Sequence, residues 1–485
     1  MQFISPRRFR ILAWSVFAFA AVSGLTLSAL FTSTGGASPS GSKKLTILYS
    51  NQAFGQIRSC NCTKFRYGGY GREATLVQNL RKEDPNVVLV EGGDAVGRED
   101  IEQDKLKSEV AMKAMKDIGY AAFVPGEAEL RFDREHIQNW AALSKTPFIM
   151  ANAKYKETGE PVCDQSYIAV KMPNGLRVTV IGVAGTELFP DMMQPNLKVE
   201  VSDPEAAVKD ILRKVRSQSE VVIVIAHMTT EKARPLARIA GIDALICTHS
   251  FEKLEMPEKD RNIVQTPHEK IGDCVFVISN SRSGWGVGRL DLEVAGKKIN
   301  VVQSRTFFLD REYDEHPTIV KLYDEYNTKV AEMTAKQQNQ FRQQFEERLK
   351  ERGIDPSTRK RESPFTGGDA CKTCHEDAYS QWAGTRHATA MATLEKMGQQ
   401  ADPECVGCHT TGALQRGGFT TLKETPNLVN VQCEACHGAG LSHKEKPAAG
   451  YGKVSEELCR SCHTEAYNPD FDYEAMLAPV RHKKD

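Results

Sequence analysis

Short apolar runs alternate with stretches of helical periodicity between Lys44 and Asp310. The apolar runs are rich in Val, Ile and Leu, which is typical of strands buried on both faces of a sheet. The stretches between them predict helices over Gly71–Arg81, Lys105–Ile118 and Pro204–Gln218. Strands that alternate with helices predict an α/β layered fold. The predicted strands are Leu45–Tyr49, Val87–Glu91, Phe148–Ala151, Val178–Val183, Val221–Ala226, Ala244–Cys247 and Cys274–Ser279.

Polar residues follow directly on several of these predicted strands. Asp94 comes after one strand, behind two glycines, and His227 comes directly after another. In open α/β sheets, ligands bind beyond the carboxyl ends of the strands. The sequence therefore predicts a site at that edge of the sheet. The other polar residues in equivalent positions are Asn51, Gln52, Thr248 and His249.

The rest of the chain has a different pattern. Residues 317–350 are rich in Lys, Glu, Gln and Arg, with apolar residues at helical spacing, which predicts a long solvated connector helix. Glycines then mark a flexible joint, and the chain beyond it has few apolar runs. The predicted organisation is an N-terminal signal or anchor over residues 1–42, an α/β domain over 43–316, a helical linker over 317–363 and a last domain over 364–485.

Four copies of the motif Cys-x-x-Cys-His lie in the last domain. This motif attaches c-type haem: the two thiols form thioethers to the porphyrin, and the adjacent His binds the iron. Two zinc sites built from the cysteine pairs are the alternative, but they leave unexplained why a His follows every pair. We therefore predict four haem c groups. The haem cysteines are Cys371, Cys374, Cys405, Cys408, Cys433, Cys436, Cys459 and Cys462, and the proximal histidines are His375, His409, His437 and His463.

Three further histidines of this domain, His387, His443 and His482, can each supply the second axial ligand of an iron. Four irons and three such histidines leave one iron short. That iron is either five-coordinate or completed by a different residue. The candidates for its sixth ligand are Met391 and Met397 of the same domain, and His316 of the α/β domain.

The N-terminus carries a basic start followed by an apolar run from Ile11 to Phe31. Covalent haem attachment takes place outside the cytoplasm, so the haem motifs require export. The run is longer than an ordinary signal peptide core and long enough to span a bilayer. A cleaved signal peptide and an uncleaved anchor in the inner membrane both stay open, and either one places the bulk of the chain in the periplasm.

The composition bears on which partners the protein binds and on whether the cysteines outside the haem motifs are paired. Lys plus Arg and Asp plus Glu number 63 each, so nothing indicates nucleic acid as a partner. The chain has 13 cysteines, and the eight haem cysteines leave five, an odd number that indicates at least one free or ligating thiol. Cys163, Cys247 and Cys274 are expected to be small buried side chains or to form one disulfide. The other two are Cys60 and Cys62.

Seven segments of the α/β part follow the order of motifs in a known family. They are Leu45–Asn51, Tyr70–Leu76, Gly92–Asp94, Ile118–Asp133, Ala226–His227, Thr248–Ser250 and His316–Pro317. In this order they resemble the metallophosphatase domain of the secreted 5′-nucleotidase and UDP-sugar hydrolase family. The resemblance implies a layered, calcineurin-like sandwich and two-metal phosphoester hydrolysis.

The chain departs from that family at the residues that hydrolysis needs. Gln52 and Phe54 stand where the family has two ligands of its first metal, and Phe251 stands at the position of another. Glu127 replaces an Asn ligand, and Ala128 replaces the catalytic His. Because two-metal hydrolysis needs both ions, we expect phosphoesterase activity to be absent or marginal, and no catalytic residue can be named.

The second-metal pocket of the family survives in altered form. Its oxygen and nitrogen donors suit one divalent Mn, Zn or Fe ion. The alternative is that they are relics that pack against neighbouring strand ends without an ion. The four residues are Asp94, Glu127, His227 and His249.

Cys60 and Cys62 lie in the loop after the first strand. They resemble a Cys-x-Cys pair, sometimes with selenocysteine, that a subgroup of phosphatase-like proteins carries at this place. Two thiols so spaced can bind a soft metal or form a redox pair. The alternative is a strained or absent disulfide, or cysteines that pair elsewhere. The half of the nucleotidase family that grips the base is absent here, which argues against a nucleotide substrate.

The last domain carries further strings between its motifs. Trp382 precedes Arg386, His387 and Ala388 after the first motif, and a Gly-Ala-Gly string precedes His443 after the third. These strings and the four motifs resemble the cytochrome c554-like tetrahaem family. The resemblance implies a mostly α, haem-packed multihaem cytochrome domain.

The sequence thus predicts a periplasmic multihaem c-type cytochrome that transfers electrons through four haems and carries a fused, degenerate metallophosphatase-like domain. Its expected partners are redox proteins or quinone-linked periplasmic carriers, with a membrane contact through the N-terminal segment. One alternative is a metal-dependent hydrolase with ancillary haems. Another is a haem reductase that acts on a small nitrogen or oxygen species at an open iron.

Overall fold

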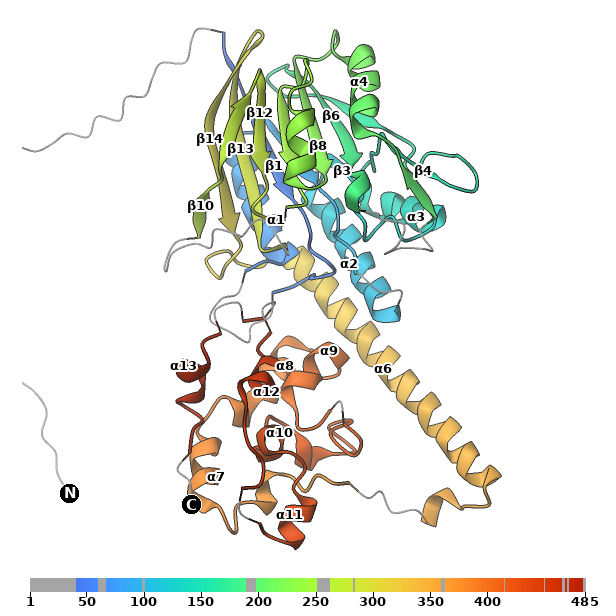
Figure 1. Ribbon diagram of the computed structural model, residues 1–485, viewed down its shortest axis with the longest axis vertical. Helices are drawn as coiled ribbons and strands as arrows, with labels where there is room; N and C mark the ends of the chain where they lie inside the picture. Colours follow the sequence, from blue (N-terminus) through green and yellow to red (C-terminus); the bar gives the residue numbers. More distant parts are fainter. Residues whose placement is uncertain are drawn as a thin grey trace, which may run out of the picture. The chain divides into compact units, whose positions relative to one another are not determined.

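The α/β part is built on two mixed six-stranded sheets (Figure 1). The computed structural model describes residues 41–59, 67–97, 101–188, 198–250, 262–281, 284–358, 363–413, 415–448, 450–464, 467–468 and 471–482. The predicted N-terminal signal or anchor, and Cys60, Cys62 and Phe251, lie outside these residues. Among the described residues, no helix combines the length and apolarity that crossing a bilayer requires.

The first sheet pairs parallel strands from the start of the chain with an antiparallel hairpin from further along it. β1 lies between β2, which runs parallel to it, and β13, which runs antiparallel. The strands of this first sheet lie in the order β10 (Ile263–Gln265), β14 (Lys298–Phe308), β13 (Gly286–Ala295), β1 (Lys43–Ser50), β2 (Val87–Glu91) and β3 (Ala122–Phe123).

The second sheet has a parallel centre and an antiparallel strand at each edge. Its order is β11 (His268–Ile271), β12 (Cys274–Ile278), β9 (Ala244–Cys247), β8 (Val221–His227), β6 (Arg177–Ala184) and β5 (Tyr167–Lys171). A separate antiparallel pair is formed by β4 (Ala153–Tyr155) and β7 (Val199–Val201).

Alternation along β8 shows how the layers pack. Val221, Ile223 and Ile225 belong to the core cluster that also holds Leu89 of the first sheet. The residues between them belong to a second cluster with Leu212 of α4. Successive side chains of a strand point to opposite faces, so the second sheet lies between the first sheet and the outer helices. The helices that share this second cluster are α4 (Pro204–Val215) and α5 (Thr230–Leu236). The helices α1 (Tyr70–Glu83), α2 (Glu102–Ile118) and α3 (Arg134–Ser144) instead contribute to the core cluster of the first sheet. A short 3-10 turn spans Thr186–Leu188.

The prediction of a strand over Phe148–Ala151 is wrong, because these residues form no regular strand. Their backbone changes partner at each residue: Ile149 donates to Phe123, Met150 to Gln165 and Ala151 to Gly182. The segment therefore bridges the edges of the two sheets and forms only isolated bridges. The sequence analysis also did not predict β13 and β14, which form the longest antiparallel ladder described here.

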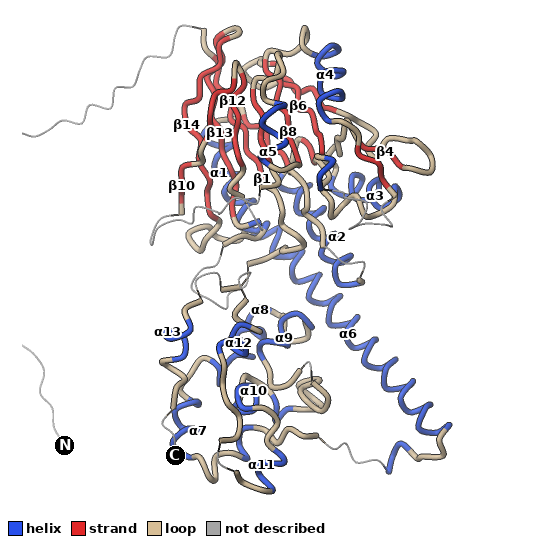
Figure 2. The backbone as a smooth tube through the Cα atoms, viewed as in Figure 1, coloured by secondary structure: helices blue, strands red, loops and turns tan. Residues whose placement is uncertain are grey.

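The predicted connector helix is α6 (Pro317–Glu351), and it is not solvated along its whole length. Ile319, Tyr323, Tyr326 and Val330 are buried in the core cluster of the α/β part. The second half is largely exposed, and the ring of Phe341 is 71% exposed. Packing of its first half thus makes α6 part of the α/β fold (Figure 2).

The regular elements of the C-terminal part are helices of eight residues or fewer, joined by turns and loops. Its own apolar core is a small cluster around Phe365, Met391, Leu394, Phe419 and Leu428. The helices are α7 (Glu376–Ala383), α8 (Ala390–Met397), α9 (Pro403–His409), α10 (Cys433–His437), α11 (Leu441–Glu445), α12 (Glu456–Arg460) and α13 (Tyr473–Leu477), with 3-10 turns over Pro356–Thr358, Gly368–Ala370, His387–Thr389 and Pro426–Leu428.

A tyrosine hydroxyl fixes α6 to the α/β part. Tyr323 donates to the carbonyl of Ile57 at 2.8 Å and accepts from the amide of Gly71 at 2.8 Å. Tyr323→Phe leaves both buried backbone groups without this partner, so we expect a loss of about 1–3 kcal/mol of unfolding free energy. Urea denaturation followed by circular dichroism measures it. Tyr313→Phe is the control, because its hydroxyl has no hydrogen-bond partner among the described residues, and an equal loss in both variants would contradict the assignment.

Candidate metal centre and haem attachment sites

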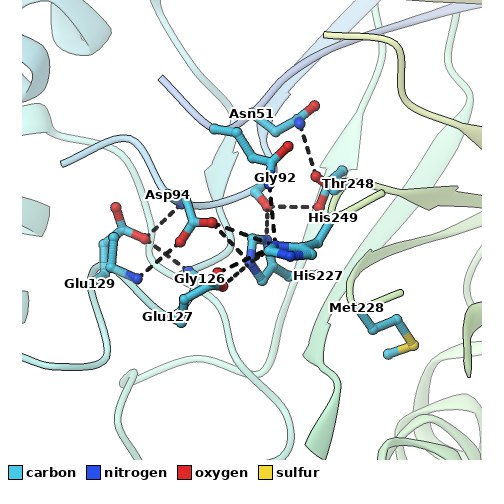
Figure 3. A network of polar contacts seen from close by, with 12 residues as sticks. Asn51, Gly92, Asp94, Gly126, Glu127, Glu129, His227, Met228, Thr248 and His249 are labelled. Carbon is cyan, nitrogen blue, oxygen red and sulfur yellow. Dashed lines mark hydrogen bonds and ion pairs between the residues drawn. The ribbon is translucent and has the colours of Figure 1, made fainter. Parts of the chain in front are cut away.

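Four predicted ligands converge at the carboxyl ends of the strands (Figure 3). Asp94 follows β2, Glu127 follows β3, His227 ends β8 and His249 follows β9. One ligand atom from each lies within 4.8 Å of the others. The two sheets therefore bring together residues far apart in the sequence, as the sequence predicted for this edge.

His227 is oriented by a backbone carbonyl. Its Nδ1 donates to the carbonyl oxygen of Gly92 at 2.6 Å. Its Nε2 therefore points to the cluster, 2.7 Å from Glu127 Oε2 and 3.4 Å from Asp94 Oδ2. Metal-binding histidines are commonly held in this way, with one ring nitrogen on a carbonyl and the other on the metal.

His249 completes the cluster. Its Nδ1 lies 3.3 Å from His227 Nε2, 3.5 Å from Glu127 Oε1 and 3.6 Å from Asp94 Oδ2. Asp94 Oδ2 is buried and accepts no hydrogen bond within the described part of the chain. A buried carboxylate oxygen without a donor, facing two imidazole nitrogens, fits a cation at their centre.

Charge is concentrated in this cluster. Burial opposes the protonated form of His227, yet Asp94 and Glu127 raise the pKa of His227 well above its ordinary value. Burial likewise opposes ionisation of Asp94, but His227 and His249 lower the pKa of that carboxyl. The carboxylates thus favour a protonated His227, and the imidazoles favour an ionised Asp94.

Glu129 positions the loop that presents Asp94, and the sequence analysis did not identify it. Its carboxylate is fully buried and accepts from the amides of Asp94, Ala95, Val96 and Gly126 at 2.8–3.0 Å. Burial, together with the charge of Asp94, raises the pKa of Glu129 to about 7. The acidic residue two positions after Glu127 was the available signal.

The place of the lost first-metal ligands is filled by this chain's own residues. Gln52 Nε2 lies 3.2 Å from His249 Nδ1, so a neutral amide contacts the histidine there. Gln52, Phe54 and Asp94 all have left-handed backbone, with φ of 57°, 47° and 61°. Such backbone is strained in residues other than glycine and concentrates at functional sites. Gln52 and Phe54 lie on one loop and Asp94 lies on another. Both loops have strained backbone, although Gln52 and Phe54 stand where the resembled family has metal ligands.

Histidines pair across the C-terminal part. A metal–imidazole bond is about 2 Å long, so two imidazoles on one iron have ring centres about 6 Å apart. The ring centres of His375 and His443 are 6.3 Å apart, and those of His387 and His463 are also 6.3 Å apart. The third pair, His437 and His482, is separated by 5.6 Å. Each pair joins one motif histidine to one of the three other histidines, and the spacing fits a shared iron.

His409 differs from the other motif histidines. Among the described residues, no second histidine faces it at this ring spacing. Its Nδ1 donates to the carbonyl of Ala390 at 2.7 Å, which leaves Nε2 as the free ligand atom. Met391 is buried in the apolar cluster that contacts Cys405 of the same motif. His316, another sequence candidate, lines a cavity beside α1 together with Ala74, Gln78, Arg81, Lys82, Asp117, Ile118 and Ile319.

The motif cysteines lie side by side across different motifs. A hydrogen bond joins the thiols of Cys371 and Cys433, which raises the pKa of the first and lowers that of the second. A hydrogen bond from Cys408 lowers the pKa of Cys462 to about 6. The first and third motifs are therefore neighbours, as are the second and fourth.

The three cysteines outside the motifs that the structure describes form no disulfide. Cys163, Cys247 and Cys274 are buried, as expected for small apolar side chains, and the alternative of a disulfide among them is wrong. Burial raises the pKa of the Cys274 thiol to about 12. They are therefore structural residues of the α/β core.

Comparison with known proteins supports each half separately. The family model described as cytochrome c554 and c-prime matches residues 370–438. Cytochrome c-554 of Nitrosomonas europaea is 32% identical over 137 residues, which cover 21% of this chain and 58% of that protein. A 5′-nucleotidase of Vibrio vulnificus is 24% identical over 289 residues, which cover 53% of this chain and 50% of that protein.

A solved structure supports the fold of the α/β part. The 5′-nucleotidase precursor from Thermus thermophilus superposes with a TM-score of 0.50 at 17% identity, covering 59% of each chain. The chain spans about half the length of the curated relatives that it matches. The predicted fold class, a layered α/β sandwich followed by a mostly helical part, is confirmed. The chain is therefore a fusion of a 5′-nucleotidase-like α/β region with a cytochrome c554-like region.

Proposed function

We propose that this protein is a periplasmic multihaem c-type cytochrome that transfers electrons through four covalently attached haems. The observation that carries the proposal is the set of three histidine pairs at ring separations of 5.6–6.3 Å. Each pair unites segments far apart in sequence at the spacing that one iron requires. Haem supplies one-electron redox chemistry when bound, and axial ligation and burial set its potential.

The cysteine contacts support a grouping of the proposed haems. Thiols of the first motif lie beside those of the third, and thiols of the second lie beside those of the fourth. Two pairs of neighbouring haems are therefore proposed on the electron path, with redox proteins or quinone-linked carriers as partners.

The second motif favours one further activity. His409 faces no second histidine in the described part of the chain, and Cys405 and Val406 of its motif pack against the apolar cluster that holds Met391. An iron held there by His409 alone has a face open to a small nitrogen or oxygen species. Reduction of such a species is the second candidate function, and the paired histidines of the other motifs would close their irons to it.

The α/β region is proposed to hold one divalent ion, Mn, Zn or Fe. Asp94, Glu127, His227 and His249 would bind it, and such an ion acts as a Lewis acid when bound. Gln52 and Phe54 cannot replace the ligands of a first metal. Hydrolysis in the manner of the 5′-nucleotidases is therefore disfavoured.

The first test is the haem count. The purified protein should exceed the polypeptide mass by four haem groups, and its colour should survive denaturation, because thioether bonds are covalent. Intact mass spectrometry measures this. Cys405→Ala combined with Cys408→Ala should remove one haem and leave three. A wild-type mass that shows two haems or fewer would overturn the proposal.

The second test is axial ligation. His387→Ala and His443→Ala should each convert one haem from low spin to high spin, because each removes one of two axial imidazoles. EPR spectroscopy counts the spin states. His136→Ala is the control, since His136 lies on α3 and pairs with Asp133 far from the motifs in sequence. Four low-spin centres in the wild type, unchanged by cyanide or nitric oxide, would rule out the open iron.

The third test separates metal binding from hydrolysis. We expect about one Mn or Zn ion per chain, or one Fe beyond the haem iron, and Asp94→Ala should lose it, whereas the exposed Asp210→Ala should retain it. Elemental analysis measures the ion. Turnover of nucleotides, UDP-sugars and an aryl phosphate should fall far below the usual range of about 1–1,000 per second. Turnover within that range, abolished by Asp94→Ala, would show an active hydrolase.

A further inference from the structure

Asp402 is a buried carboxylate at the start of a haem-motif helix. It is the N-cap of α9, which carries Cys405, Cys408 and His409. The residue is 5% exposed, and its Oδ1 accepts from the amide of Glu404 at 2.9 Å. A cap of this kind fixes the first turn of the helix, and here the first turn includes a haem cysteine.

Two residues from the nucleotidase-like region and its helix hold this carboxylate. Gln103 Nε2 on α2 donates to Asp402 Oδ1 at 2.7 Å. The hydroxyl of Tyr326 on α6 lies 3.5 Å from Oδ2 and accepts from Gln103 at 3.0 Å. Gln103 and Tyr326 are 5% and 4% exposed. Residues 42–485 form one unit by their contacts, and this buried triad is part of it.

The donors around Asp402 are neutral. No lysine, arginine or histidine of the described residues forms an ion pair with it. The nearby Lys107 on α2 pairs instead with Glu404 and, at 3.6 Å, with Asp104. Neutral donors therefore hold the Asp402 carboxylate, and no direct ion pair with it is formed among the described residues.

The same carboxylate lies against the first cysteine of the motif. Burial raises the pKa of the Cys405 thiol, and the charge of Asp402 and a hydrogen bond to it act in the same direction. In the haem-bound protein this sulfur is a thioether and has no hydrogen to donate. A haem attached at Cys405 would bring its porphyrin edge close to this carboxylate, and a negative charge beside a haem would favour the oxidised iron, which carries one more positive charge.

We propose that Asp402, held in place by Gln103 and Tyr326 of the nucleotidase-like region, lowers the reduction potential of the haem attached at Cys405 and Cys408. The inference rests on the proposed haem at this motif. It gives the degenerate region a function that needs no hydrolysis: it sets the potential of the one haem whose proximal histidine lacks a paired histidine among the described residues.

The test is spectroelectrochemical titration of the full-length haem protein carrying Asp402→Asn. Asparagine keeps the size and the acceptor of the cap and removes the charge. The midpoint potential of this haem should rise by at least about 59 mV, a tenfold change in its one-electron equilibrium constant. The haem is assigned by its absence from the Cys405→Ala, Cys408→Ala variant. Potentials of the other three haems should change less.

Gln103→Leu tests the role of the nucleotidase-like region independently. Without its donor, the buried carboxylate either takes up a proton or turns away, and both remove the charge from the porphyrin edge. Gln103→Leu alone should raise the midpoint potential of this haem. In the double variant, Asp402→Asn should add less than half of the potential shift that it causes in the wild-type protein. A full additional shift would show that Gln103 does not position the carboxylate.

Asp472→Asn is the matched control. Asp472 caps α13 in the same region, accepts from the amide of Ala475 at 2.8 Å and is exposed. It should leave all four potentials unchanged. Four haems by mass with an unchanged potential in Asp402→Asn would overturn this inference alone. A wild-type protein without haem at Cys405 and Cys408 would instead overturn the proposed function.

Discussion

The separation that one iron imposes on two imidazoles is the constraint on which the C-terminal part depends. Its helices are short, and its apolar core is one small cluster around Phe365 and Met391. Such a core supplies little of the burial that folding needs. The pairs His375–His443, His387–His463 and His437–His482 instead bring distant segments to the spacing at which a shared iron would join them. Haem binding and folding of this region are therefore expected to be coupled, as for other small domains built around a bound group.

The candidate metal centre of the α/β region does not depend on a bound group in this way. Its four ligands are placed by two sheets whose central strands are fully buried, so the geometry exists before any ion binds. Asp94 and Glu127 favour the protonated form of His227 against the cost of its burial. The two sheets therefore bring these four side chains together although a neutral amide, that of Gln52, contacts His249.

Much of this could be predicted from the sequence, because periodicity and motif spacing are local signals. The buried run Val221–Ala226 and the haem motifs are such signals, and the fold class followed from them. The segment Phe148–Ala151 misled the prediction, because partner changes at each residue leave no trace in composition. Glu129 and the pairing of His387 with His463 depend on contacts between distant segments. Burial of Tyr323 likewise depends on a surface that the helix itself does not encode.

One helix links the two halves physically. A side chain at Gly97, in the loop after Asp94, would meet Asp104 of α2 at 2.2 Å, and one at Gly55 would approach Lys107 of α2 at 3.5 Å. The same helix supplies Gln103 to Asp402. The loops of the degenerate centre therefore rest on the helix that supports a haem-motif cap. Changes in the loop around Gly97 reach α2 through direct contact, since close packing transmits displacement instead of absorbing it. A region that has lost its hydrolytic ligands would still be retained if its packing sets the environment of the neighbouring haem.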